Sequence, residues 1–168
     1  MTESDRTAAL AQFVVEWLVH THGGEVELLD RSLTDAENLR MVLLDRLTLY
    51  VTPDIGEPSS GRPPEPDTVL LSACVGTRIA DTGAADYAIH EFTISTTVPE
   101  DVRLSTTSAG FRQVWVDRPL STTTDLGVVG ELVDEFVHTA EQLRTVIAPL
   151  DLDVSNDAIQ RAIVDDFR

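Results

Sequence analysis

The sequence predicts an α+β fold in which an antiparallel sheet of about five strands packs against an N-terminal helix and a long C-terminal helix. Three observations predict it: apolar residues recur with helical spacing over 126–149, they do so again over 4–20, and short β-branched runs bounded by turn residues lie between. Because 168 residues suit one hydrophobic core, we expect a single domain over residues 1–168.

The long C-terminal helix is the clearest element. Thr124 or Asp125 can cap its start, and Pro149 lies where the run should end. Steps of three and four residues stack its apolar side chains on one face, which must be buried. That face holds Val129, Leu132, Val133, Phe136, Val137, Ala140, Leu143 and Ile147, and the opposite face holds Glu131, Asp134, Glu135, Glu141 and Arg144.

The first helix is expected over 4–20, with Thr2 or Ser4 as its cap and Gly23-Gly24 as its stop. Its apolar surface is wider than one sheet contact usually needs, so it could pack against the C-terminal helix or form part of a subunit interface. One face comprises Ala8, Ala11, Val14, Val15 and Leu18, and Leu10, Phe13 and Trp17 widen it.

The clearest strands are 47–52 and the near-continuous apolar run 68–75. Residues 102–106 and 111–117 flank Ser108-Ala109-Gly110 and predict a hairpin, with Val114 and Val116 on one face and Trp115 on the other. Residues 54–67 are rich in proline and glycine and predict an exposed loop.

Two segments carry competing signals. Over 36–44, a capping box at 34–37 favours a helix, whereas the alternation of apolar residues from Leu39 onward favours a strand. Over 84–97, Ala85, Ala88, Ile89 and Phe92 have helical spacing, but the tail 92–98 is rich in β-branched residues. From propensity we predict a strand over 86–98.

Residues 155–168 predict a short terminal helix, which could dock on its own domain, on a partner or on a second subunit. Three helices with apolar stripes offer more surface than one face of the sheet can cover. We therefore predict a homodimer that buries the first or the last helix. The candidate partner-binding residues are Trp17, Ile159, Ile163 and Phe167.

The charge is strongly acidic, since 29 Asp and Glu face 12 basic residues, all arginine, for a formal net charge of −17. Such a chain repels phosphate backbones, so we expect no nucleic-acid partner. One interpretation is a halophilic-type or GC-rich composition, as in haloarchaeal proteins. The other is a functional acidity, in a mimic or a chaperone that binds a basic partner.

The sequence predicts a cytoplasmic protein without a membrane segment. No window holds 18 consecutive apolar residues, and residues 1–5 are acidic where a signal peptide needs positive charge. Cys74 is the single cysteine and lies in an apolar run, so it should pack as a small hydrophobic residue.

No stretch carries a catalytic signature, and we expect neither an enzyme nor a cofactor. The nearest approach to a metal motif is His20 with His22, which would need His90, His138 or a distant carboxylate as further ligand. Their position near a helix C-terminus accounts for them without a metal. There is no Gly-x-Ser-x-Gly elbow and no glycine-rich loop after a strand.

The order of expected elements resembles the type III secretion chaperone-like fold, including the YbjN-like proteins. The similarity covers roughly 4–150, and it is closest where 110–116 leads into the helix 126–150. It requires a helix over 84–92, and it has no counterpart for 155–168. The resemblance implies a non-enzymatic, acidic, usually dimeric protein that binds an extended segment of another polypeptide.

Two other classes of function stay open. A long C-terminal helix on a curved antiparallel sheet also resembles the helix-grip proteins, which bind small apolar ligands. The third class is an enzyme whose site is assembled from dispersed residues.

Overall fold

The computed structural model describes residues 2–27, 40–53, 63, 65–109 and 111–152. Its fold is α+β as predicted, with six strands instead of about five. The helices of this part are α1 (Glu3–His22), α2 (Thr82–Ser95) and α3 (Leu126–Ile147), and a 3-10 turn, η2 (Ala148–Leu150), follows α3. The strands are β1 (Glu25–Glu27), β2 (Arg40–Leu43), β3 (Thr48–Pro53), β4 (Thr68–Ile79), β5 (Arg103–Ala109) and β6 (Phe111–Ser121).

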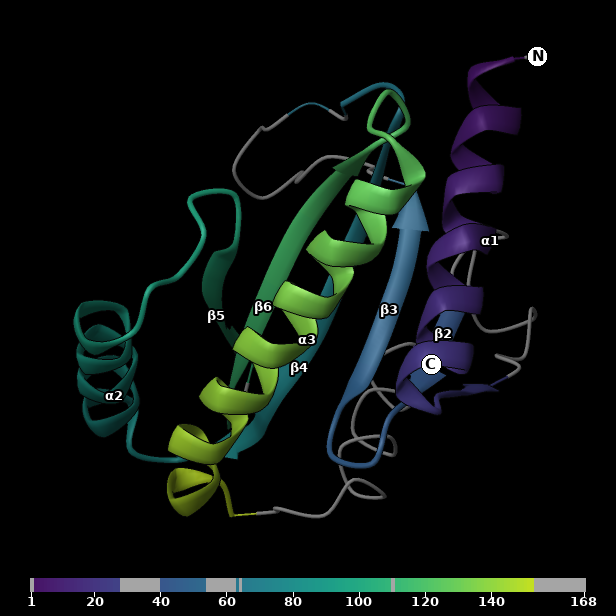
Figure 1. Cartoon of the computed structure of the whole chain (residues 1–168). Coiled ribbons are helices and arrows are strands. Elements are labelled where there is room, and N and C mark those ends of the chain that lie inside the picture. The colour runs from purple at the N-terminus through teal and green to yellow at the C-terminus, as the bar shows by residue number, and fades with distance from the viewer. Residues whose placement is uncertain (1, 28–39, 54–62, 64, 110, 153–168) are drawn as a thin grey trace.

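The six strands form one antiparallel sheet in the order β1-β2-β3-β4-β6-β5. Helices α1 and α3 lie on the same face of it, and α2 stands beside the C-terminal half of α3, toward the β5 edge (Figure 1). Strands β5 and β6 form the predicted hairpin, with Ala109 opposite Phe111.

Strand β4 is the centre of the sheet, since it pairs with β3 on one side and β6 on the other. Its register against β6 shifts between Cys74 and Gly76 and again between Gly76 and Ile79. A Cβ atom on Gly76 would lie 2.7 Å from the Cγ2 atom of Ile147. Glycine is therefore needed here for the end of α3 to approach the bulged strand.

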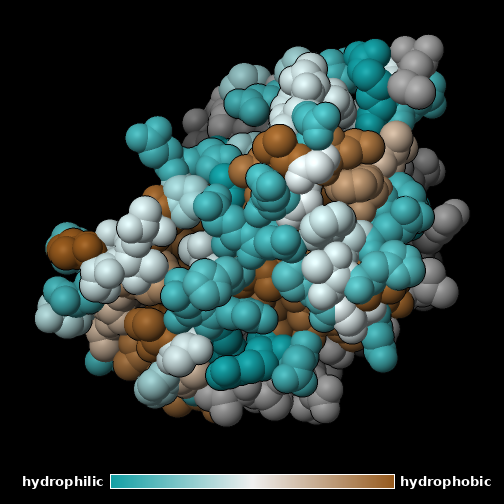
Figure 2. Space-filling view, viewed as in Figure 1, coloured by the Kyte–Doolittle hydropathy of each residue, from teal (hydrophilic) through white to brown (hydrophobic). Residues whose placement is uncertain are grey.

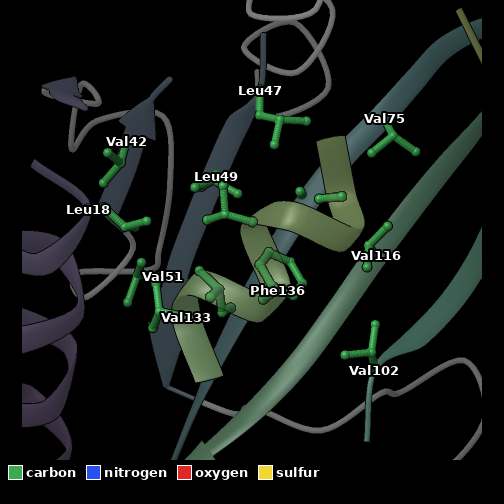
Figure 3. Packing of buried hydrophobic residues seen from close by; sticks show 14 of the residues in the cluster. Leu18, Val42, Leu47, Leu49, Val51, Val75, Val102, Val116, Val133 and Phe136 are labelled. Atoms are coloured by element: carbon green, nitrogen blue, oxygen red, sulfur yellow. The ribbon is translucent and has the colours of Figure 1, made fainter. Parts of the chain in front are cut away.

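The main core lies between the sheet and the helices α1 and α3. Alternate residues of the longer strands face it, so Leu49 and Val51 of β3 belong to the same buried cluster as Phe136 of α3, which is 0% exposed (Figure 3). Trp115 faces away from this core, as predicted. Its ring centroid lies 5.8 Å from that of Tyr50, and a second cluster there includes the buried Met41 and Cys74.

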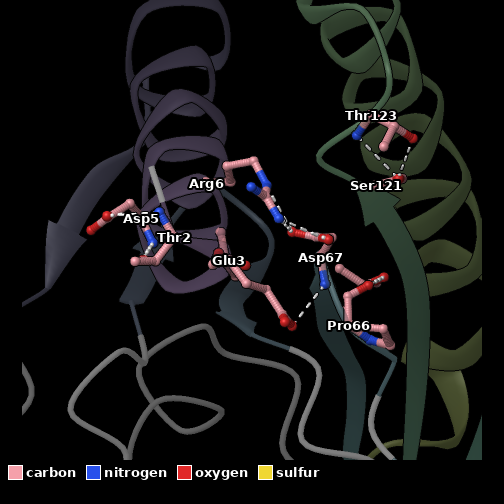
Figure 4. A network of polar contacts seen from close by, with 10 residues as sticks. Thr2, Glu3, Asp5, Arg6, Pro66, Asp67, Ser121 and Thr123 are labelled. Atoms are coloured by element: carbon pink, nitrogen blue, oxygen red, sulfur yellow. Dashed lines mark hydrogen bonds and ion pairs between the residues drawn. The ribbon is translucent and has the colours of Figure 1, made fainter.

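Helix α1 begins and ends where the sequence predicted. The Thr2 hydroxyl accepts from the Asp5 amide, and the Asp5 carboxylate accepts from the Thr2 amide, which lowers the pKa of Asp5. Gly23 ends the helix with a φ of 69°. Its N-terminal turns are tied to β4, because Arg6 pairs with Asp67 at 2.9 Å and Glu3 accepts from the Asp67 amide (Figure 4).

The prediction of a strand over 86–98 is wrong, because Thr82–Ser95 form helix α2. The Asp81 carboxylate caps its start by accepting from the Ala84 amide at 3.0 Å. The helical spacing of Ala85 and Phe92 prevails because both are buried against the core. Two hydroxyls of the tail are satisfied within the helix, since Thr93 donates to the His90 carbonyl and Ser95 to the Glu91 carbonyl.

Segment 36–44 is a strand in its described part, since Arg40–Leu43 pair with β3. Arg144 also differs from expectation: it was placed on the exposed face of α3, yet it is 3% exposed and bonds to Asp151. The capping box at 34–37, the terminal helix over 155–168 and most of the loop 54–67 lie outside the described residues.

Candidate functional site

A groove of about 420 Å³ separates helix α2 from the C-terminal half of α3. Phe92 and Ala88 of α2 and Val146 of α3 give it an apolar floor. Polar groups from both helices border it. The described residues that line the groove are Ala88, Glu91, Phe92, Ser95, Thr96, Gln142, Thr145 and Val146.

Two arginines of β6 hold α2 and the segment that follows it. Arg112 pairs with Asp86 of α2, their Nη1 and Oδ1 atoms lying 2.6 Å apart. The nearly buried Arg118 donates to both carboxylate oxygens of Asp101 at 2.9 and 3.0 Å, and to Glu135 of α3 at 2.7 Å. These contacts join α2, β6 and α3. Both helices that border the groove are therefore tied to β6 by ion pairs.

The surface of the groove combines apolar and acidic groups. Val146 is 39% exposed, and Glu91 of the lining is exposed. Figure 2 shows hydrophobic atoms at the lower left of the view, where α2 lies beside α3, whereas the outer face of α3 is mostly hydrophilic. Tyr87 and Ile94, on the outer side of α2, are 66% and 67% exposed.

Of the predicted partner-binding residues, the structure describes Trp17. Its indole nitrogen donates to Asp134 at 2.8 Å, its ring stacks on Phe13, and it packs closely over Gly130 of α3. Much of the wide apolar stripe of α1 is thus covered within the chain. Ile159, Ile163 and Phe167 lie outside the described residues, so the structure does not bring the four together.

His22, in the last turn of α1, contacts a carboxylate of α3, whereas His20 is exposed. His22 Nε2 lies 2.7 Å from Asp134 Oδ1, the same oxygen that accepts from Trp17. Asp134 therefore joins α1 to α3. Within the described ranges, no group of three His, Cys, Asp or Glu side chains is placed to hold a metal ion.

The inner face of α3 leaves no ligand space of the helix-grip kind in the described core. Val133, Phe136, Leu143 and Ile147 are each 0% exposed and fill the interval between this helix and the sheet. A small apolar ligand would have to displace these side chains to bind beneath α3.

Comparison with known proteins adds no relative, since neither a protein-family model nor a curated protein matches the chain. In the part that the structure describes, no helix has the length and apolar character to cross a bilayer.

The sequence contained one signal for the groove, the helical spacing of Ala85, Ala88, Ile89 and Phe92. The prediction of a strand misses this signal. The side chains of residues 88 and 92 lie on one face in a strand and in a helix alike, whereas those of 85 and 92 do so only in a helix. The other wall, Gln142 to Val146, is an ordinary helix surface until α2 lies beside it.

Proposed function

We propose that the chain is a non-catalytic, cytoplasmic binding protein, chaperone-like or regulatory, that holds a segment of another polypeptide in the α2–α3 groove. The observation that carries the proposal is the groove itself, whose apolar floor lies open between two helices. An open groove of this kind suits a few side chains of a helical or extended segment. A small ligand is usually enclosed far more completely.

The charge of the protein determines the chemistry of the partner. A chain with a formal net charge of −17 attracts a basic segment and repels an acidic one. Glu91 brings that charge to the groove, where Phe92 and Val146 provide apolar contact. The partner is therefore an amphipathic segment with apolar anchors on one side and Lys or Arg on the other.

The resemblance to the type III secretion chaperone-like fold is consistent with this proposal. It required a helix over 84–92, and α2 covers those residues. Membership of that class stays a prediction, and the proposed function rests on the groove and on its charge.

The test uses a fluorescent synthetic peptide of about five helical turns, with Leu repeating at three- and four-residue steps and Lys elsewhere. We expect saturable binding that weakens as salt rises, and no binding of the same peptide with Glu in place of Lys. Equal binding of the acidic and basic peptides would overturn the charge argument.

Two valines of α3 provide a matched pair of variants. Val146→Asn removes an apolar anchor from the groove and should weaken binding about fivefold or more. Val128→Asn makes the same change at the other end of the helix, where valine is also exposed, and should leave binding unchanged. Equal effects of the two substitutions would place the peptide elsewhere.

A further inference from the structure

A second hollow, of about 450 Å³, lies on the other side of the molecule from the groove, between α1 and the ends of β2 and β3. Ala8, Ala11 and Pro53 give it apolar walls, and Arg40 provides a cation. The other described lining residues are Thr2, Glu3, Thr7 and Gln12. Its size falls within the roughly 300 to 1,000 Å³ of small-molecule sites.

We propose that this hollow binds a small monoanionic amphiphile, a carboxylate with a short apolar chain, through the guanidinium of Arg40. The site is separate from the α2–α3 groove, and the inference does not depend on the proposed function.

Arg40 differs from four of the eight described arginines of this acidic chain. Arg6, Arg112, Arg118 and Arg144 each pair with a carboxylate. No hydrogen bond or ion pair joins the side chain of Arg40 to another described residue. Val42, two residues along β2, faces the main core, so Arg40 points to the same side of the sheet as α1.

The charges around the hollow limit the ligand to a single negative charge, placed at Arg40. The guanidinium matches a carboxylate or a phosphate in shape. Glu3 also borders the hollow, and a dianionic phosphate would meet repulsion from it and from the whole chain. The apolar surfaces of Ala8, Ala11 and Pro53 favour a hydrocarbon chain on the ligand.

The walls of the hollow are positioned by contacts in which Arg40 takes no part. Arg6 and Glu3 tie the first turns of α1 to Asp67, and Thr7 donates its hydroxyl to the Glu3 carbonyl. Figure 4 shows that the side chains of Glu3 and Arg6 reach Asp67 between α1 and the start of β4. The α1 wall is therefore held in place without any contribution from the guanidinium of Arg40.

The experiment is calorimetric titration of the full chain with octanoate, octan-1-ol and octyl phosphate. We expect octanoate to bind about fivefold tighter than octanol at low salt, and molar KCl to remove that difference. Octyl phosphate should bind more weakly than octanoate. Absence of octanoate binding at millimolar concentration, or a preference for the phosphate, would overturn the proposal.

Matched variants locate the site. Arg40→Gln should reduce octanoate affinity to that of octanol. Arg46→Gln removes the same charge from the β2–β3 turn, at the other end of the hairpin, and should have no effect. Ala8→Trp fills the hollow from an exposed position and should abolish binding of both ligands. Unchanged thermal melting of each variant shows that it is folded, and octanoate binding that survives both Arg40→Gln and Ala8→Trp would refute the assignment.

Discussion

Arg144 and Asp151 form a buried ion pair where α3 ends. The guanidinium donates to Asp151 at 3.1 Å and to the Val75 carbonyl at 2.9 Å, and Asp151 also accepts from the amides of Thr77 and Arg78. The pair therefore joins α3 to the bulged end of β4. A buried charge is tolerated here because each of its partners is in place.

Removing one member of this pair should be costly. Arg144→Met leaves the Asp151 carboxylate in a site where its side chain is 0% exposed, and we expect a loss of about 3 to 5 kcal/mol in the free energy of unfolding. Urea denaturation measures it, with the exposed Arg103→Met as control. A cycle with Asp151→Asn should give a double variant that loses less than the sum of the singles. Additive losses would contradict the coupling.

Helix α3 illustrates at the scale of an element how a periodic pattern becomes a buried face. Of its eight expected inward residues, seven are buried and Leu132 is half-buried. Asp125 caps the helix by accepting from the Gly127 amide at 2.9 Å. The burial of Phe136 identifies the face on which a charge cannot be accommodated.

Phe136→Asp should prevent folding, because an unpaired charge in the core costs several kcal/mol. Circular dichroism and the yield of soluble protein are the measurements. Val128→Asp, an exposed change in the first turn of the same helix, should fold normally. A soluble Phe136→Asp variant with wild-type melting would show that another face is inside.

Helix α2 can be tested by a substitution whose sign depends on the secondary structure. Ile94 is 67% exposed, so Ile94→Ala should stabilise a helix by up to about 0.5 kcal/mol, whereas it would destabilise a strand. Ile89→Ala is the control, because Ile89 packs on the core and its truncation should cost about 1 to 3 kcal/mol. Destabilisation by both substitutions would argue against the helix.

At the scale of the whole molecule, the net charge should affect the stability of the fold. With a formal net charge of −17, self-repulsion opposes the folded state, and added salt screens it. If the acidity is an adaptation to salt, the thermal midpoint should rise from low to molar KCl. Melting in glucose at the same osmolarity is the control, because this neutral solute is excluded from the protein surface but does not screen charge. A flat or falling midpoint would instead favour acidity that serves partner binding.

Self-association is also a property of the whole molecule, and the homodimer stays a prediction. The described structure covers much of the α1 stripe that motivated it, so the prediction now rests chiefly on residues 153–168. Light scattering after size exclusion should show a dimer for the full chain and a monomer for a form ending at Asp153. A monodisperse monomer of the full chain at micromolar concentration, in low and high salt, would remove it.

The sequence alone predicted the features that depend on local periodicity and end signals. The stripe around Phe136, the cap at Thr2, the Gly23 stop and the alternation of Val114, Trp115 and Val116 each depend on neighbours a few residues away. Such short-range regularities specify which side of an element is apolar, so α1, α3, the hairpin and the α+β class were recoverable.

The tertiary structure decided what depends on distant partners. The burial of Ala85 and Phe92 outweighed the strand preference of the β-branched tail, so α2 is a helix. The ion pair with Asp151 allows Arg144 to be buried. The groove and the Arg40 hollow likewise require surfaces far apart in sequence to lie side by side, as Phe92 and Val146 do. Propensities of a few tenths of a kcal/mol per residue cannot foresee these outcomes, because burial and ion pairing contribute several times more and act through contacts that exist only after folding.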